Sequence, residues 1–325
     1  MSILVTGGAG YIGSHTAHAL ADRGENIVVL DNLVSGVRAF VPAAAGFVNG
    51  TAGNREIVGR IIEEFRVDTV IHFAGSIMVP ESIRKPLEYY ENNTEVSRTL
   101  IAACIEKGVN QFIFSSTAAV YGTVEMAPVG EDAPTIPVNP YGRSKLMVEW
   151  MLKDAAQTYG FRYIALRYFN VGGVDPGGRA GQPERQVPHL IKRAAQVALG
   201  HADVLDVYGT DYPTRDGTAV RDYIHIADLV EAHLSAVAHL RDGGRAGIYN
   251  CGYGKGSSVL EVVGTFEAVL GRVLPVRRAP RREGDAAFVV ADPSRICAAM
   301  GWHPRFDRLD QIVRSTLEWE ARTHA

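Results

Sequence analysis

The sequence predicts an α/β fold, with a doubly wound parallel sheet in the first part of the chain and a smaller α/β domain after it. Short apolar runs alternate with amphipathic stretches over the first half of the 325 residues, as in a parallel sheet wound with helices. Several apolar runs contain consecutive β-branched residues, a feature of strands that are buried on both faces. A glycine directly follows three of the amphipathic stretches, at the position where helices commonly end.

The predicted elements of this first part follow from the period of the apolar residues. Strands are expected at residues 2–6, 27–31, 69–73, 111–115 and 162–167. Helices are expected between them, at residues 11–23, 55–65, 91–107 and 141–159.

The texture of the chain changes after Asn170. Residues 172–183 are rich in glycine and proline and predict a long loop, and long loops in compact domains are often functional. Shorter elements are expected beyond it, with helices at 187–199, 227–240, 259–270 and 309–323 and a strand at 204–208. We therefore expect one domain over residues 1–170, to which a segment near 222–250 returns, and a second domain over residues 171–325.

Composition and charge argue against several classes of partner. The net charge is −3, the isoelectric point is about 6.4 and there is no basic stripe, which argues against nucleic acid. The sequence has no apolar run of membrane-spanning length and no signal peptide, so we expect a cytoplasmic protein that does not enter a membrane. The three cysteines, Cys104, Cys251 and Cys297, are too widely spaced for a metal motif, and no metal site is expected.

A glycine-rich turn follows the first predicted strand. Gly7, Gly10 and Gly13 recur every three residues where the strand gives way to a helix. This spacing suits a tight turn, a close approach of backbone to a pyrophosphate, and close packing of helix on strand. Asp31 ends the next strand, at the distance where a carboxylate reaches the ribose diol and repels a 2′-phosphate. The pattern predicts a Rossmann-like site for NAD.

A second group of residues predicts proton transfer. Tyr141 and Lys145 are four residues apart on a predicted helix and therefore share a face. The Lys145 ammonium, helped by the positive nicotinamide ring, is expected to lower the pKa of the Tyr141 phenol, which then accepts a proton from an alcohol while hydride leaves for NAD. Thr117 follows a strand whose carboxyl end is the expected ligand edge, so its hydroxyl can bond the reacting oxygen.

With these motifs in place, the chain resembles the extended short-chain dehydrogenase/reductases, and among them the UDP-hexose 4-epimerases. The resemblance extends over nearly the whole chain. It rests on VTGGAGYIGSH (5–15), VIHFAG (70–75), PLEYY (86–90), RYFN (167–170), YPTRDGT (212–218), VRDYIH (220–225) and APRREGD (279–285).

The resemblance implies an enzyme that inverts C4 of a UDP-hexose through a transient 4-keto sugar, with NAD bound throughout. It implies that Tyr141 is the base, that Lys145 holds the nicotinamide ribose and that Thr117 contacts the 4-oxygen. It further implies a homodimer formed through the helices at 91–107 and 141–159, an NAD-binding first domain and a UDP-sugar-binding second domain. The implied cofactor-binding residues are Gly7, Gly10, Tyr11, Ile12, Gly13, Asp31, Asn32, Thr51, Ala52, Phe73, Ala74, Gly75, Asn92, Ser115, Tyr141, Lys145 and Tyr168. The implied substrate-binding residues are Thr117, Tyr141, Asn170, His189, Leu190, Arg221, Arg282, Asp285 and Val289.

The chain departs from the family pattern at three places. Thr51 replaces the usual aspartate at the adenine amino group, which predicts weaker retention of NAD. Residues 76–82 contain no lysine where some members have one, so one cofactor contact is expected to be missing. Val289 occupies the position where a bulky tyrosine excludes N-acetylated sugars, which predicts tolerance of UDP-N-acetylhexosamines; if Phe288 occupied that position instead, the prediction would reverse.

Other functions on the same scaffold are weighed against the inversion at C4. A 4,6-dehydratase or a decarboxylase needs an acid beside the hydroxyl residue, whereas Thr117 is followed by Ala118 and Ala119. A 4-epimerase of UDP-N-acetylhexosamine, UDP-uronic acid or UDP-pentose stays open. A non-catalytic NAD-sensing regulator would have no need of Tyr141 and Lys145 together.

Overall fold

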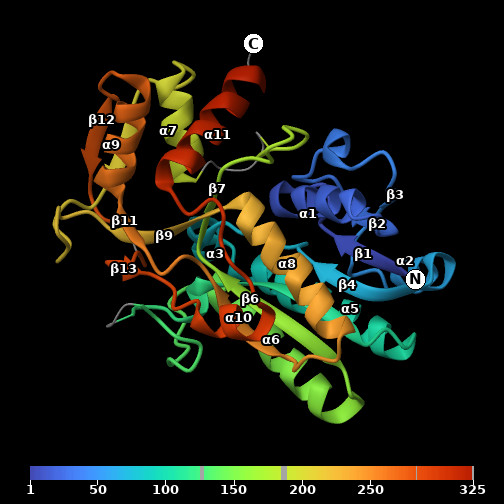
Figure 1. Ribbon diagram of the computed structural model, residues 1–325. Coiled ribbons are helices and arrows are strands. Elements are labelled where there is room, and N and C mark those ends of the chain that lie inside the picture. The colour runs from blue at the N-terminus through green and yellow to red at the C-terminus, as the bar shows by residue number, and fades with distance from the viewer. Residues whose placement is uncertain (125–127, 184–188, 283, 324–325) are drawn as a thin grey trace. The chain divides into compact units, whose positions relative to one another are not determined.

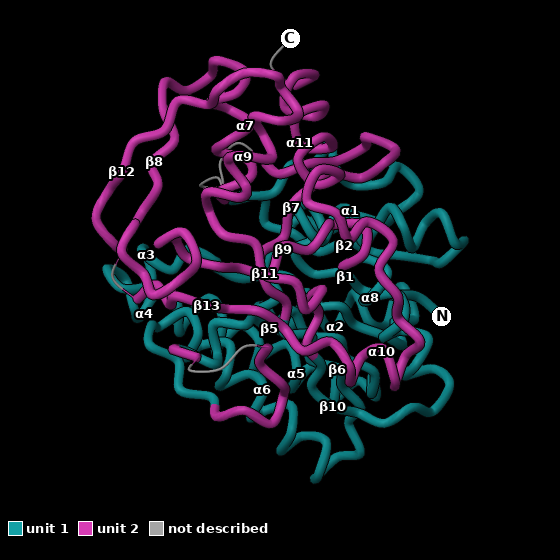
Figure 2. The backbone as a smooth tube through the Cα atoms, turned by 60° about the vertical axis from the view of Figure 1, so that its left-hand side comes forward, with its two compact units in different colours: residues 1–122, 135–167, 230–249 teal, residues 123–134, 168–229, 250–325 magenta. Residues whose placement is uncertain are grey.

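The computed structural model describes residues 1–124, 128–183, 189–282 and 284–323. Contacts within the chain divide it into two compact units, which Figure 2 colours teal and magenta. Unit 1 comprises Met1–Gly122, Thr135–Arg167 and Val230–Tyr249, and unit 2 comprises Thr123–Pro134, Tyr168–Leu229 and Asn250–Ala325. The short stretch Thr123–Pro134 thus belongs to unit 2, whereas the sequence alone placed it in the first domain.

Unit 1 is built on a seven-stranded sheet (Figure 1). Its strand order is β10-β6-β5-β4-β1-β2-β3, and the pairs from β5 to β3 run parallel. The predicted α/β fold with a doubly wound parallel sheet is confirmed. The strands β3 and β10 were not predicted; both lie at edges of the sheet, where strands are short and do not need a continuous apolar run. The bounds are β1 Ser2–Thr6, β2 Ile27–Asp31, β3 Gly46–Asn49, β4 Val67–His72, β5 Gln111–Thr117, β6 Arg162–Tyr168 and β10 Gly247–Cys251.

Helices cover both faces of this sheet (Figure 1). The apolar faces of α2 (Arg55–Phe65), α5 (Val96–Glu106) and α6 (Pro140–Tyr159) pack on one face, in a single buried cluster with side chains of the central strands. The helices α1 (Tyr11–Asp22) and α8 (Ile226–Arg241) lie against the other face. Because both faces are covered, every residue of β1 and β2 is buried.

The predicted helix at 91–107 has a more complex form. It begins as α4 (Pro86–Tyr89), continues as the π-helical segment η2 (Tyr90–Glu95) and ends as α5. The wider π-helical turn of η2 changes which side chains face inward. The apolar pattern of the sequence did not predict it. Shorter elements of this unit are η1 (Arg38–Phe40), α3 (Val79–Arg84) and η3 (Ala118–Val120).

Unit 2 contains two small sheets and a group of helices. Strand β9 (Val220–His225) pairs with β7 (Asn170–Gly172), β11 (Gly256–Ser258) and β13 (Phe288–Val289), while β8 (Leu205–Tyr208) pairs with β12 (Val276–Ala279). The core is formed mainly by side chains of α7, α9 and α11. The helix predicted at 187–199 begins at Leu190 with His189 as its N-cap, and the predicted positions 187 and 188 lie outside the described residues. The helices are α7 Leu190–Ala198, α9 Val259–Leu270, α10 Ser294–Met300 and α11 Leu309–Thr323.

No helix in the described part of the chain has the length and apolar character needed to cross a membrane.

Candidate active site

The turn after β1 contains two positions, Gly7 and Gly13, where neighbouring backbone atoms leave no space for a side chain. Gly7 has a φ of +70°, and a Cβ placed on it would lie 2.6 Å from the Ala74 nitrogen. A Cβ on Gly13 would lie 2.2 Å from the Gly7 carbonyl oxygen. A Cβ on Gly10 would meet only the Gly7 oxygen, at 3.2 Å. The space beside Gly10 is therefore left open by the protein, as a close approach of phosphate requires.

The helix α1 begins directly after this turn. Gly10 caps it, and among the described residues it has neither a side-chain cap nor an acidic residue in its first turn. The first amides, at Tyr11, Ile12 and Gly13, therefore present the positive end of the helix dipole to an anion.

Asp31 lies at the end of β2 and is 7% exposed. Its Oδ2 accepts a hydrogen bond from the Ala9 amide at 3.0 Å, and its Oδ1 accepts one from Leu33 at 2.8 Å. Each carboxylate oxygen keeps a lone pair, so the group can still accept bonds from a diol. Asn32 beside it is exposed and accepts from the Val34 amide at 3.2 Å.

Thr51 and Ala52 follow β3. The Thr51 hydroxyl is exposed, and its oxygen accepts a hydrogen bond from the Gly53 amide at 3.2 Å. Ala52 is buried and packs in the core of unit 1. The hydroxyl thus closes a local turn and offers one neutral acceptor where a carboxylate would offer a charged one.

Lys145 is buried at the carboxyl end of β5. Its Nζ donates a hydrogen bond to the Ser115 carbonyl at 3.0 Å and lies 4.9 Å from the centre of the Phe114 ring. Burial lowers the pKa of Lys145 to about 8. A Cβ on Gly75 would lie 3.6 Å from Nζ, so the Phe73-Ala74-Gly75 run passes directly beside the ammonium.

Tyr141 lies in the first turn of α6 because the helix starts one residue before it. Pro140 occupies the first turn, and the Asn139 side chain caps the helix by accepting from the Gly142 amide at 2.8 Å. A Cβ on Gly142 would lie 2.5 Å from the Ala119 carbonyl oxygen. This glycine therefore lets the start of α6 approach the backbone that follows Thr117.

The approach places the Tyr141 phenol beside the Thr117 side chain. Burial raises the pKa of Tyr141 above its ordinary value, and the neighbouring Thr117 hydroxyl opposes this shift. The sequence predicted a pKa lowered by Lys145 together with the nicotinamide ring of NAD. In the protein alone, desolvation of the phenolate outweighs the neighbouring groups, and the lowered pKa in the NAD complex stays a prediction.

A buried polar cluster continues along the same face of α6. Glu149, one turn beyond Lys145, accepts a hydrogen bond from the Ser116 hydroxyl at 2.5 Å. It also accepts from Arg167 Nε at 2.9 Å and from Arg167 Nη2 at 2.5 Å. Successive turns of α6 are thus tied to Thr117, Ser115 and Ser116. The sequence analysis did not identify Glu149 or Arg167 as partners, since they lie 18 residues apart on different elements.

Asn93 is a third residue that the sequence did not reveal. It is 1% exposed; its oxygen accepts from the Ser76 amide at 2.7 Å, and its Nδ2 donates to the Ser144 hydroxyl at 3.0 Å. The predicted cofactor residue Asn92 is exposed, with its Nδ2 3.3 Å from the Ser76 hydroxyl. The π-helical turn of η2 thus directs Asn93 inward, and the cofactor contact of Asn92 stays a prediction.

Unit 2 gathers four of the predicted substrate residues. Arg221 Nη2 lies 3.9 Å from Asp285 Oδ1, and the Arg282 guanidinium lies 3.7 Å from the centre of the Tyr208 ring. Val289 is the register partner of Arg221 in the parallel pair of β13 and β9. Side chains of register partners point to the same face of a sheet, so Val289 shares a face with Arg221.

The other predicted substrate and cofactor residues of unit 2 lie at the ends of its elements. Tyr168 ends β6, and Asn170 begins β7 as the register partner of Tyr223. His189 caps α7 and Leu190 is its first residue. The roles of these four residues in binding substrate and cofactor stay predictions. Within the described ranges no group of three histidine, cysteine or acidic side chains is arranged to hold a metal ion.

Comparisons with known proteins agree with this chemistry. Residues 3–252 match the NAD dependent epimerase/dehydratase family. The chain is 55% identical over 318 residues to UDP-glucose 4-epimerase of Azospirillum brasilense, covering 98% of this chain and 91% of the relative.

Solved structures give the same result at the level of the fold. The UDP-glucose 4-epimerase of Brucella ovis in complex with NAD superposes with a TM-score of 0.94 at 43% identity, covering 98% of this chain and 97% of that one. The enzyme of Bifidobacterium longum in complex with NAD+ and UDP also gives a TM-score of 0.94, at 36% identity, covering 100% and 99%. The chain belongs to the NAD dependent epimerase/dehydratase family.

Proposed function

We propose that this protein is an NAD-dependent UDP-glucose 4-epimerase, which interconverts UDP-glucose and UDP-galactose through a transient 4-keto sugar. The observation that carries the proposal is the close approach of α6 to the carboxyl end of β5, which places Tyr141 beside Thr117 and ties the buried Lys145 to the Ser115 carbonyl at 3.0 Å. In open α/β sheets ligands bind at this edge. The full-length similarity to UDP-glucose 4-epimerases supports the same activity.

The residues of unit 1 fit NAD as the resident cofactor. The space beside Gly10 and the open first turn of α1 suit a pyrophosphate, and the Asp31 carboxylate suits a ribose diol. Phe73, Ala74, Gly75 and Ser115 pass beside the Lys145 ammonium, which holds the nicotinamide ribose. When bound, NAD+ supplies the acceptor that takes hydride from C4 and returns it to the opposite face of the sugar.

The proton moves through the Tyr141 phenol. The Thr117 hydroxyl bonds the 4-oxygen of the sugar and orients it toward the phenol, which accepts the 4-hydroxyl proton as hydride leaves C4. The Lys145 ammonium stabilises the phenolate that forms. After the 4-keto sugar has rotated to present its opposite face, the same phenol returns the proton to the new 4-hydroxyl.

Inversion requires a firm hold on the nucleotide and a loose hold on the sugar. Arg221 and Arg282 of unit 2 offer guanidinium groups that suit a diphosphate, and Asp285 beside Arg221 suits the uridine ribose. Asn170 contacts the phosphate region. Because these charged groups lie in unit 2, we assign unit 2 as the UDP-sugar-binding domain. Unit 1, which carries the glycine-rich turn and Asp31, is the NAD-binding domain.

The size of residue 289 sets the range of sugars. Val289 shares a face of the sheet with Arg221, one of the two arginines proposed to bind the diphosphate. Phe288, in contrast, pairs with the buried Val220. A valine leaves more space there than a tyrosine, so UDP-N-acetylgalactosamine is accepted as a second substrate.

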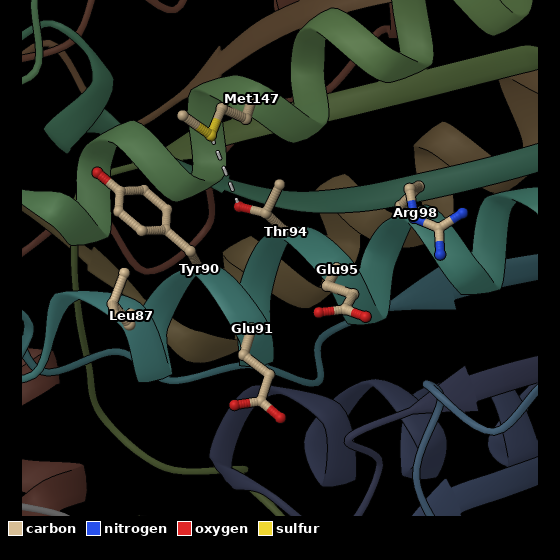
Figure 3. Close-up of a pocket in the computed structure, with 7 residues that line it drawn as sticks. All are labelled: Leu87, Tyr90, Glu91, Thr94, Glu95, Arg98 and Met147. Atoms are coloured by element: carbon tan, nitrogen blue, oxygen red, sulfur yellow. Dashed lines mark hydrogen bonds between the residues drawn. The ribbon is translucent and has the colours of Figure 1, made fainter.

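A homodimer forms through η2, α5 and α6. A surface hollow of about 470 Å³ lies over these helices. In Figure 3 Met147 of α6 faces Thr94 of η2, whose hydroxyl lies 3.9 Å from the methionine sulfur. Leu87 beside the hollow is 78% exposed, and Trp150 of α6 is also exposed. A second copy of the chain would bury these apolar side chains. The lining residues are Leu87, Tyr90, Glu91, Thr94, Glu95, Arg98 and Met147.

Sedimentation tests the dimer. Wild type is expected to sediment as a dimer, and Leu87→Glu as a monomer with unchanged folding. The matched control is Val273→Glu, equally exposed in unit 2, which leaves the dimer intact. A wild-type monomer at micromolar concentration would contradict this interface.

The activity is tested with UDP-galactose, UDP-N-acetylgalactosamine and UDP-galacturonate on one NAD-loaded preparation. We expect turnover of the first two, and loss of turnover in Tyr141→Phe, which removes only the phenol oxygen. Tyr159→Phe, on an exposed tyrosine of the same helix, is the control with wild-type turnover. Tight UDP-sugar binding without turnover would contradict the epimerase and favour a regulator; turnover of UDP-galacturonate alone would identify a different substrate.

A further inference from the structure

Tyr212 carries a buried hydroxyl that has no hydrogen-bond partner among the described residues. The residue lies in the loop between β8 and β9 and is 6% exposed, and its Oη is inaccessible to solvent. Buried hydroxyls are nearly always paired, so an unpaired one indicates a partner that arrives from elsewhere or moves into place.

The ring of Tyr212 is held firmly, so the hydroxyl cannot turn to find another partner. A Cβ on Gly209 would lie 2.4 Å from the ring, which therefore rests directly on the loop backbone. The Arg281 guanidinium lies 4.2 Å from the ring centre on a side chain that donates to Asp211 Oδ1 at 2.7 Å. The Tyr212 amide donates to the Gly217 carbonyl at 2.9 Å.

Two proposed substrate residues carry charges that act on the Tyr212 hydroxyl. Burial raises the pKa of Tyr212, as does the Asp285 carboxylate, while the guanidinium groups of Arg221 and Arg281 lower it. These charges act on the hydroxyl because they lie near it. Arg281 is already engaged by Asp211, which leaves Arg221 and Asp285 as the groups that can rearrange.

The pair formed by Arg221 and Asp285 is loose. Their closest atoms are 3.9 Å apart, beyond the length of a hydrogen bond, and the Asp285 side chain is 38% exposed. The Arg221 side chain is 14% exposed and its Nη1 donates to the Val220 carbonyl at 2.9 Å, so the guanidinium is anchored at one nitrogen. Among the described residues its Nη2 takes part only in the loose pair, which contributes little stability and can be broken at small cost. A nucleotide diphosphate offers Arg221 a better partner than this carboxylate.

We propose that Tyr212 is a positioning residue for the nucleotide, whose hydroxyl donates a hydrogen bond to Asp285 once Arg221 has turned to the bound diphosphate. This inference rests on the proposed function. In the nucleotide-bound protein the new bond replaces the lost contact with Arg221 and holds the Asp285 carboxylate in place for the ribose. The hydroxyl is therefore used only in the bound state.

The test is Tyr212→Phe in NAD-loaded protein, with UDP titrated by calorimetry. Loss of one hydrogen bond to a charged group is expected to weaken UDP binding about tenfold. KM for UDP-galactose rises by the same factor and kcat is unchanged. The melting temperature without UDP stays at the wild-type value, because no bond is lost in the free protein, whereas a merely structural hydroxyl would lower it.

Two further variants complete the test. Tyr249→Phe removes a hydroxyl that donates to the Arg245 carbonyl at 3.2 Å, so it should lower the melting temperature and leave UDP binding unchanged. In an Asp285→Ala background, Tyr212→Phe should cause no additional loss of UDP affinity, since the bond acts through Asp285.

The outcomes separate this inference from the proposed function. Wild-type UDP affinity in Tyr212→Phe, or an undiminished tenfold effect in the Asp285→Ala background, would overturn the role of Tyr212 alone. Failure of the wild-type protein to bind UDP would overturn the proposed function together with this role.

Discussion

The ammonium nitrogen of Lys145 donates a hydrogen bond to the main-chain carbonyl of Ser115 at 3.0 Å. The bond joins the second turn of α6 to the end of β5, beside the turn that carries Thr117. One buried cation therefore ties the helix to the sheet, and we propose that it also stabilises the Tyr141 phenolate during turnover. Each role makes its own prediction.

Replacement of Lys145 by methionine is expected to change the pH dependence of stability. Burial lowers the pKa of Lys145 from 10.5 to about 8, so between these values the unfolded chain binds a proton that the folded protein does not. The penalty for burying the charge is complete below pH 8 and is relieved as the pH rises to 10.5. Relative to Lys145→Met, wild type should gain up to about 3 kcal/mol of unfolding free energy across this window.

Urea denaturation of both proteins at several pH values measures this difference. Turnover of Lys145→Met should also fall by about a hundredfold, because the phenolate loses its neighbouring charge. A stability difference that does not vary with pH would contradict a buried, depressed lysine.

Replacement of Gly142 by alanine is expected to impair turnover more than folding. The new methyl group would lie 2.5 Å from the Ala119 carbonyl oxygen, so the start of α6 must move away from Thr117. A displacement of this kind between reacting groups costs about tenfold to a hundredfold in kcat.

The matched control for this change is Gly264→Ala in α9, where a Cβ meets nothing within 4 Å. This change should leave kcat unchanged and stabilise the protein by about 0.5–1 kcal/mol, as alanine is the better helix former. Wild-type kcat in Gly142→Ala would show that the close approach is not needed for catalysis.

Replacement of Thr51 by aspartate is expected to slow the release of NAD. The hydroxyl already accepts from the Gly53 amide, and a carboxylate would keep this bond while offering a charged oxygen to the adenine amino group. The gain is about 1 kcal/mol, or roughly fivefold in the dissociation rate. Thr51→Ser keeps a neutral acceptor and should release NAD at the wild-type rate. Stopped-flow displacement measures both, and equal rates for all three proteins would remove Thr51 from the adenine site.

Replacement of Val289 by tyrosine is expected to narrow the range of substrates. The larger ring would fill the face shared with Arg221, so turnover of UDP-N-acetylgalactosamine should fall by more than about tenfold, with UDP-galactose little affected. Phe288→Tyr alters the neighbouring position, which pairs with Val220, and should leave the ratio of the two activities unchanged. If the wild-type protein does not turn over UDP-N-acetylgalactosamine, the proposed role of Val289 is contradicted.

Local signals in the sequence account for the parts of the fold that were predicted well. The helix α6 was predicted within a residue, because Pro140 and Gly160 mark its ends and Asn139 caps its start. The edge strands β3 and β10 were missed, since partly exposed edges lack the apolar run of a central strand. The π-helical turn of η2 was missed because it depends on tertiary contacts of Asn93 rather than on apolar period.

The candidate site divides in the same way. Tyr141 and Lys145 were identified from their four-residue spacing on a predicted helix. Thr117 was identified from its position at the end of a predicted strand. The ion pair of Glu149 with Arg167 needs the packing of α6 on β6, which no local pattern provides. The raised pKa of Tyr141 in the protein alone was not predicted for a related reason, since desolvation depends on burial that the sequence does not specify.

The most direct test of the account follows the hydrogen on C4. UDP-galactose carrying deuterium at C4 is converted by the NAD-loaded protein in ordinary water without added NAD, and the product is analysed by NMR and mass spectrometry. We expect UDP-glucose with the deuterium fully retained at C4, because hydride leaves and returns within one site. Loss of deuterium to water, or a product from which water has been eliminated, would contradict it.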